Sequence, residues 1–239
     1  MRKNRNRILL GCLLAGACLA PFAAQASPIV SMELTGVQGA SLHGVYTSPY
    51  YGQIGPQGLT TDSQFTSQNS HSAAIYCDDF YDDVEIGHVW QATVTNLGQL
   101  STNSLDTHLM FHDTSAATQA SDYMAAAWIA EQIAGGKLSS EDASYALWRI
   151  FDSNALQGLS SSDSSAAWQD YEDAFAAVAN DTPSQFWNVK IYTPLQSTPG
   201  SASSQEYLTV DASEPSTLAL ALLGLGAVAL AASRRRRLI

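Results

Sequence analysis

Residues 122–151 decide the fold class, and they read DYMAAAWIAEQIA (122–134), GGKLSS (135–140) and EDASYALWRIF (141–151). The first stretch places apolar side chains on one helical stripe, formed by Tyr123, Ala126, Ala127, Ala130 and Ile133. Gly135 and Gly136 follow as a helix stop. A pair of serines then precedes Glu141 and Asp142, as at a helix N-terminus, and the predicted buried face is Ala143, Leu147, Ile150 and Phe151. Two consecutive helices are therefore predicted.

The segments on either side complete an α+β pattern. A third helix is predicted from about 164 to 179, with one face formed by Trp168, Tyr171, Phe175 and Val178. β-branched and aromatic residues predict strands at 29–34, 41–46, 72–80, 89–97, 186–192 and 206–210. The polar, glycine-containing segment 49–70 is predicted to be loop or irregular edge structure. This order favours an antiparallel β-rich domain with a central layer of about three helices.

The N-terminal segment has the pattern of an export signal. Four basic residues precede an apolar run at 8–20, and Ala24-Gln25-Ala26 offers the small residues that signal peptidase needs. A signal peptide is therefore predicted at 1–26. Cys18 leaves a lipoprotein open as an alternative, although Ala15 stands where a lipoprotein signal has leucine.

The C-terminal segment has the pattern of a sorting tail. Glu214-Pro215 is followed by an uncharged run at 216–233 and by four arginines, Arg234, Arg235, Arg236 and Arg237. An apolar run of this length predicts a transmembrane helix, and the arginines are expected to stay cytoplasmic.

This tail, at 213–239, resembles the PEP-CTERM sorting tail, except that Ser213 replaces the first proline of the usual Pro-Glu-Pro. The resemblance implies processing by exosortase. The protein is then expected to be exported across the inner membrane, transiently anchored there, and delivered to the outer surface or the extracellular space. An uncleaved anchor is the alternative.

The segment between the two signals, 27–212, is predicted to be one acidic extracytoplasmic domain. From 27 to 214 the chain carries three basic residues, Lys137, Arg149 and Lys190, and all 22 acidic residues, a net charge of −19. Such a charge repels nucleic acid, so no nucleic-acid partner is expected. Cys77 is the single cysteine of this segment, so an apolar core, not an internal disulfide, must hold the fold.

Several short motifs resemble a group of PEP-CTERM surface proteins. They are Ser48-Pro49-Tyr50, residues 76–80 (YCDDF), residues 144–152 (SYALWRIFD), residues 191–194 (IYTP) and residues 205–208 (QEYL). The group resembles the thioester domains of bacterial adhesins, in which a strand cysteine bonds to a glutamine before an Ala-Ile-Trp-like helix. The resemblance places Cys77 at the cysteine and Ser144 at the glutamine. Serine has no carboxamide, so the thioester is expected to be absent.

Cys77 and its acidic neighbours leave alternatives open. Cys77 is either a buried core residue or a reactive thiol. The carboxylates Asp78, Asp79, Asp82 and Asp83, with Glu85, suggest a calcium site, although strand alternation sends Asp78 and Asp79 to opposite faces. A solvated acidic loop is the alternative.

The histidines give a weaker metal prediction. His108 and His112 stand four residues apart beside Asp106 and Asp113, a spacing that would suit zinc on a helix. The zinc-protease glutamate is missing, and a loop with hydrogen-bonded histidines is the preferred interpretation. No metal or cofactor is therefore assigned, with calcium kept as an option.

Two functions from different classes follow. The chain lacks a serine-hydrolase elbow, a phosphate-binding glycine loop and a dinucleotide fingerprint, so we do not expect an enzyme. The preferred hypothesis is a non-catalytic structural or adhesive protein of the surface or of an exopolysaccharide (biofilm) matrix. The alternative is a surface protein that uses Cys77 for covalent adhesion or thiol-dependent catalysis.

Overall fold

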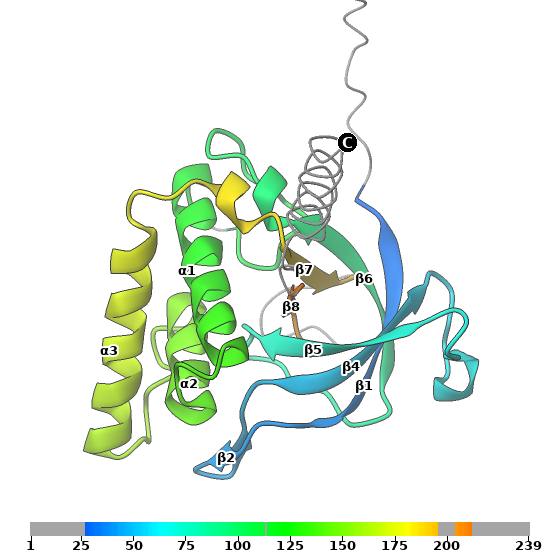
Figure 1. Cartoon of the computed structure of the whole chain (residues 1–239), viewed down its shortest axis with the longest axis horizontal. Helices are drawn as coiled ribbons and strands as arrows, with labels where there is room; N and C mark the ends of the chain where they lie inside the picture. Colours follow the sequence, from blue (N-terminus) through cyan, green and yellow to red (C-terminus); the bar gives the residue numbers. More distant parts are fainter. Residues whose placement is uncertain (1–26, 113, 196–203, 212–239) are drawn as a thin grey trace, which may run out of the picture.

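The computed structural model describes residues 27–112, 114–195 and 204–211, which form a β-barrel with three helices on one side (Figure 1). The predicted signal peptide and sorting tail lie outside these residues. The strands are β1 (Ile29–Val37), β2 (Ser41–Leu42), β3 (Val45–Tyr46), β4 (Tyr50–Pro56), β5 (His71–Cys77), β6 (Val89–Asn96), β7 (Val189–Pro194) and β8 (Tyr207–Val210). The helices are α1 (Ala116–Ala134), α2 (Ser140–Phe151) and α3 (Ser161–Val178), with short 3-10 turns at Asp62–Gln64, Leu97–Gln99 and Pro183–Phe186.

Six strands close into an antiparallel barrel in the order β1-β4-β5-β8-β7-β6. β1 pairs with β4 on one side and with β6 on the other, and β8 closes the ring between β5 and β7. The interior is filled by alternating strand side chains, among them Met32, Leu34, Ile75, Trp90 and Tyr207. The α+β class was predicted correctly, but the predicted sheet is in fact a closed barrel.

The prediction of loop or irregular edge structure at 49–70 is wrong at its beginning, because Tyr50–Pro56 forms strand β4, which is paired on both sides, with β1 and with β5. Its glycines, which suggested a loop, serve close packing instead. A Cβ at Gly52 would lie 3.0 Å from Ile75, and one at Gly55 would lie 2.7 Å from Leu59. The remaining residues, 57–70, are indeed a connection.

Three other strand predictions need correction at their boundaries. The predicted strand 41–46 is a two-stranded hairpin, β2–β3, whose turn residues His43 and Gly44 both have positive φ. β5 ends at Cys77, so Asp78 and Asp79 lie beyond the strand. The strand predicted at 186–192 begins later than expected: Pro183–Phe186 is a 3-10 turn, and β7 begins at Val189.

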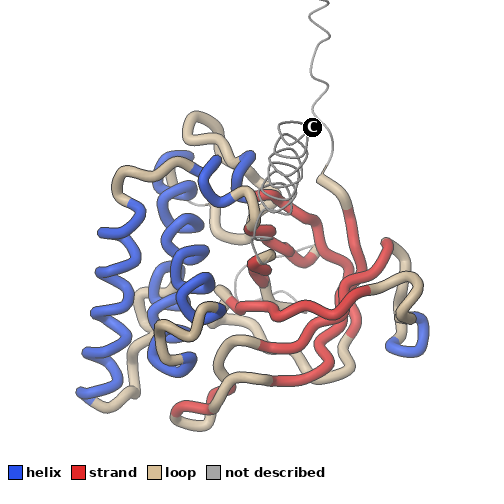
Figure 2. Tube along the Cα trace, in the orientation of Figure 1, coloured by secondary structure: helices blue, strands red, loops and turns tan. Residues whose placement is uncertain are grey.

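Each helix begins after a serine whose hydroxyl accepts a backbone hydrogen bond. Ser115, Ser139 and Ser160 cap α1, α2 and α3, so α1 and α3 start earlier than predicted. α1 and α2 pack between the barrel and α3, and Figure 2 shows this separation of helices from strands. The predicted α1 stripe is buried throughout.

The predicted face of α3 is confirmed except at Trp168: Val178 is buried, and Tyr171 and Phe175 are half-buried and pack against the helical core. The residues of this helix that are buried are Ala167, Ala174 and Val178, whereas Trp168 is 41% exposed. Trp168 stacks on Tyr171, and the Arg149 guanidinium lies 5.4 Å from the centre of each ring. Small alanines let α3 approach its neighbours closely, and Trp168 lies at the edge of the contact.

Candidate functional site

Most of the short motifs meet where β5 and β8 lie against the helical layer, β5 against α2 and β8 against α1. Cys77 ends β5 and pairs with Tyr207 of β8. The next two residues, Asp78 and Asp79, are also fully buried, although they lie in the connection to β6. The aromatic ring of Phe80 then packs 5.1 Å from that of Trp148 on α2. The segment 76–80 is therefore a junction between the barrel and the helices.

Cys77 is held by two serines that come from distant segments. Its backbone N–H donates to Ser48 Oγ at 3.1 Å, and the Ser48 N–H donates to Ser144 Oγ at 2.9 Å. Ser144, which the resemblance places at the glutamine position, is thus a buried hydrogen-bond acceptor on α2. The Cys77–Ser48–Ser144 chain ties the connection before β4 and the end of β5 to the helical layer.

The Cys77 thiol is enclosed and uncharged at neutral pH. It is fully buried, and Sγ donates to the Asp79 carbonyl oxygen at 3.0 Å. Burial raises the pKa of the thiol well above its usual range, and the charges of Asp79 and Asp78 raise it further. Hydrogen bonding by the Asp79 backbone and by the Trp148 side chain opposes this rise without cancelling it.

Glu206, just before β8, joins four regions of the fold. One carboxyl oxygen accepts from Tyr123 O–H of α1 at 2.5 Å. The other accepts from the Met110 N–H at 3.0 Å and from the Thr193 hydroxyl of β7. Glu206 is fully buried. Its carboxyl therefore holds α1, β7, β8 and the segment around Met110 together.

Asp78 lies beside Glu206 and holds its proton more tightly than a free aspartic acid does. Burial raises the pKa of Asp78 well above its usual range, and the charges of Glu206 and Asp79 add to the effect. The Asp78 carboxyl oxygens receive no hydrogen bond from a donor group of the described residues, but they lie within hydrogen-bonding reach of Glu206. A proton on Asp78 satisfies that contact, because two carboxylates alone would repel each other.

Asp79 is also fully buried, but its partners differ from those of Asp78. Its Oδ1 accepts from the Tyr81 N–H at 2.9 Å, whereas its buried Oδ2 receives no hydrogen bond from a donor in the described chain. Burial raises the pKa of Asp79 to about 7; the Tyr81 N–H opposes the rise, and the charges of Asp82 and Glu206 add to it. Asp79 therefore changes charge near neutral pH.

Gln205 fixes the segment that carries these aspartates. Its Nε2 donates to the Asp79 carbonyl at 3.1 Å and also to the Asp82 carbonyl. Its Oε1 accepts from the Tyr207 hydroxyl at 2.9 Å. The carboxamide thus positions the turn after β5 against β8.

The stability of the domain is expected to decrease as the pH rises from about 4 to about 7. The folded state keeps a proton on Asp79 up to about pH 7, whereas the ordinary pKa is 3.8, so the native state binds more protons in this interval. Asp78 and Glu206, whose pKa values are also raised, act in the same direction. Thermal melting at several pH values measures the slope. Asp79→Asn should make the melting temperature less dependent on pH. A wild-type melting temperature that rises over this interval would contradict the account.

A pocket of about 530 Å³ lies beside the junction, and Asp79 is among its lining residues. Its walls are mainly apolar and come from β1, the β2–β3 hairpin, β4, the 79–86 segment and α2. Tyr46 and Ile86, which also line it, are 61% and 62% exposed. Asp79, Trp148 and Gln205 lie in its lining beside these residues. The junction thus has an opening to solvent.

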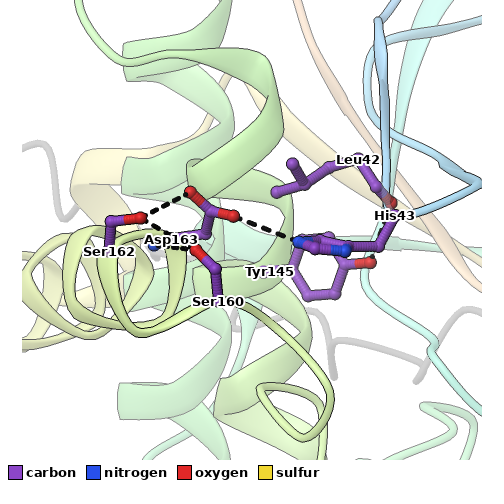
Figure 3. A network of polar contacts seen from close by, with 6 residues as sticks. All are labelled: Leu42, His43, Tyr145, Ser160, Ser162 and Asp163. Carbon is purple, nitrogen blue, oxygen red and sulfur yellow. Dashed lines mark hydrogen bonds and ion pairs between the residues drawn. The ribbon is translucent and has the colours of Figure 1, made fainter.

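The β2–β3 hairpin at this pocket is fastened to the helices (Figure 3). His43 Nε2 lies 3.1 Å from Asp163 Oδ2 at the start of α3, and the Tyr145 hydroxyl of α2 donates to the Leu42 carbonyl at 3.2 Å. Ser160 and then His43 lower the pKa of Asp163 by hydrogen bonding. These contacts hold Val45 and Tyr46 at the pocket.

The calcium candidates are not arranged as one site. Asp78 faces Glu206, Asp79 lies in the pocket lining, and Asp83 is exposed. Within the described ranges, no three His, Cys, Asp or Glu side chains are grouped so that they could hold a metal ion. Calcium binding has therefore no geometric support here.

The histidine pair lies in a loop, which was the preferred interpretation of the sequence. His108 and His112 are not on a helix, and His112 Nδ1 lies 2.6 Å from the Leu109 carbonyl oxygen. His108 is exposed, and the Asp106 carboxylate accepts its backbone N–H. Asp113 is outside the described residues.

Sequence reasoning did not identify Glu206 or Gln205 as site residues, although the motif at 205–208 contains both. The signal that could have found Glu206 is a lone acid before an alternating apolar strand, since such an acid must find partners if it is buried. No pattern in the sequence indicated the roles of Ser48 or of the hairpin residues.

Comparison with known protein families finds a match at the C-terminal segment. Residues 211–237 match the family model of the PEP-CTERM protein-sorting motif, which includes Glu214, Pro215 and the four arginines. The motif implies export, processing by exosortase and membrane-linked sorting to the cell surface. No curated protein matches the chain. Among the helices that the structure describes, none is long and apolar enough to cross a membrane; the predicted segment 216–233 lies beyond them.

Proposed function

We propose that this exported, exosortase-sorted protein acts without catalysis as a structural or adhesive component of the outer surface or of an exopolysaccharide (biofilm) matrix. The sorting motif at 211–237 carries the proposal, because it directs the acidic domain away from the cytoplasm. The protein would be anchored transiently in the inner membrane by the helix predicted at 216–233. Signal peptidase and exosortase would be the processing partners, and an exopolysaccharide or surface ligand the final one.

The domain offers features suited to such a role. Its barrel and helices are joined by buried hydrogen bonds through Glu206 and Ser144, which favours a rigid body without a disulfide. The neighbouring pocket provides a place for a ligand. Burial of the Cys77 thiol argues against covalent chemistry by that residue.

A distant relationship to thioester adhesin domains belongs to this proposal. Its support is the position of Cys77 at the end of a strand that faces α2, next to Trp148. Ser144 lacks the carboxamide that a thioester needs, and its hydroxyl already accepts the Ser48 N–H. Adhesion would then use noncovalent contacts on the same scaffold.

The sorting motif can be tested by substitution in the native host. Glu214→Ala combined with Pro215→Ala should keep the protein in the inner-membrane fraction, because the processing enzyme would no longer recognise the motif. Ser213→Ala is the matched control and should be released like the wild type. Release of the double variant at the wild-type level would overturn the assigned role of Glu214 and Pro215.

A further inference from the structure

The pocket that Asp79 helps to line has the dimensions and walls of a small-molecule site. Its volume of about 530 Å³ lies within the range of known ligand pockets. The walls include the rings of Tyr46, Tyr50, Phe80 and Trp148. Exposed apolar side chains that gather beside a hollow are typical of an interaction site.

The acidic residues that line the pocket favour a positively charged ligand. Its lining contains Asp79, Asp83 and Glu85 and, among the described residues, no Lys, Arg or His. Two of the three basic residues in the described chain are engaged elsewhere: Lys190 pairs with Asp211, and Arg149 packs on Trp168 and Tyr171. An anionic ligand would meet like charge, whereas a cationic ligand would meet opposite charge.

Asp79 supplies an acceptor at this pocket that no donor group of the described residues uses, although the Asp82 carboxyl lies within hydrogen-bonding reach of its side chain. The residue is fully buried, and its Oδ2 receives no hydrogen bond from a described donor. A buried carboxylate oxygen without a donor is costly, and a ligand ammonium group would satisfy it. The aromatic walls would favour the same cation through their ring faces. A hydrated metal ion would gain little from such walls.

We propose that this pocket binds a small organic ammonium compound, with its charged nitrogen at Asp79 and its apolar or aromatic body against Tyr46, Tyr50 and Phe80. The inference deepens the proposed surface role by naming a ligand class, and it rests on that role only for its biological setting. Failure of sorting would leave binding unchanged, and failure of binding would leave sorting unchanged.

Phenethylamine is the test probe, with 2-phenylethanol and 3-phenylpropionate as its neutral and anionic counterparts. Calorimetry on protein recovered from its host should show the amine binding at least about tenfold more tightly than the alcohol, as one charge-assisted hydrogen bond gives. The carboxylate should bind most weakly. Equal binding of amine and alcohol, or no binding of the amine, would overturn the proposal.

Matched variants locate the contact. Asp79→Asn should remove the preference for amine over alcohol, whereas Glu172→Gln, an exposed position of α3 outside the pocket lining, should retain it. Tyr46→Ala should lower the affinities for the amine and for the alcohol by the same factor. A melting curve checks that each variant is folded, and a wild-type preference in folded Asp79→Asn would refute the assigned contact.

The pH dependence gives a second readout. The charged groups that act on Asp79 are Asp82 and Glu206, with Asp78 and Cys77 beside it and Asp83 and Glu85 in the pocket lining. The pKa of Asp79 is about 7, so amine affinity should rise about tenfold between about pH 6 and about pH 8 as the carboxylate forms. The alcohol should show no such rise, and an amine affinity that falls over this interval would contradict the contact.

Discussion

Replacing Glu206 by alanine is expected to lower the free energy of unfolding by about 3–5 kcal/mol, the range seen when one partner of a buried charged network is removed. The Met110 N–H, the Tyr123 hydroxyl and the Thr193 hydroxyl would each lose the acceptor they have in the native structure. Asp78 would also lose the carboxyl beside it. Urea unfolding followed by fluorescence measures the change, since the barrel and helices both contain tryptophan.

Two variants make the Glu206 result specific. Glu206→Gln keeps one carbonyl oxygen as an acceptor and should cost less than alanine does. Glu172→Ala removes an exposed carboxylate of α3 and should change stability by no more than about 0.5 kcal/mol. If Glu206→Ala were as stable as Glu172→Ala, Glu206 would not hold the barrel and the helices together.

Cys77 should resist alkylation in the native protein. We expect iodoacetamide to modify it at least about a hundredfold more slowly than in the unfolded chain, which corresponds to an opening free energy of about 3 kcal/mol. The reason is that the thiol is fully buried and its raised pKa keeps it protonated. Peptide mass spectrometry assigns the label to Cys77.

An exposed thiol provides the control for this experiment. Ser104→Cys in a Cys77→Ser background places a thiol on an exposed loop and should react nearly as fast as an unfolded chain. The Cys77→Ser variant itself should retain ligand binding if the role is noncovalent. Rapid native labelling of Cys77 would favour the alternative of a reactive surface thiol.

The elements that the sequence predicted best are those whose signal is local. The α1 stripe from Tyr123 to Ile133 and the N-terminus of α2 at Ser139 follow from helical spacing and capping, and both were confirmed. β4 was missed because Gly52 and Gly55 are required by contacts with Ile75 and Leu59, which lie elsewhere in the chain. A glycine that serves packing and a glycine that serves a loop look alike in sequence.

The site was only partly predictable for a similar reason. The motifs around Cys77 and Trp148 identified the region, since short stretches of the sequence resemble a known group. The role of Glu206 depends on donors from three other segments, including Tyr123 and Thr193, and only the fold brings them together. The closure of the barrel likewise depends on the short β8, whose four residues carry little signal alone.

The most direct test of the central claim is the intact mass of the protein from its native host, measured in membrane and extracellular fractions with and without a working exosortase. The account predicts that, with exosortase, the released protein lacks everything after the Glu214-Pro215 region, and that without exosortase the tail with Arg234–Arg237 is retained in the membrane fraction. A tail that is present in both hosts would contradict exosortase sorting and would make the protein an inner-membrane protein.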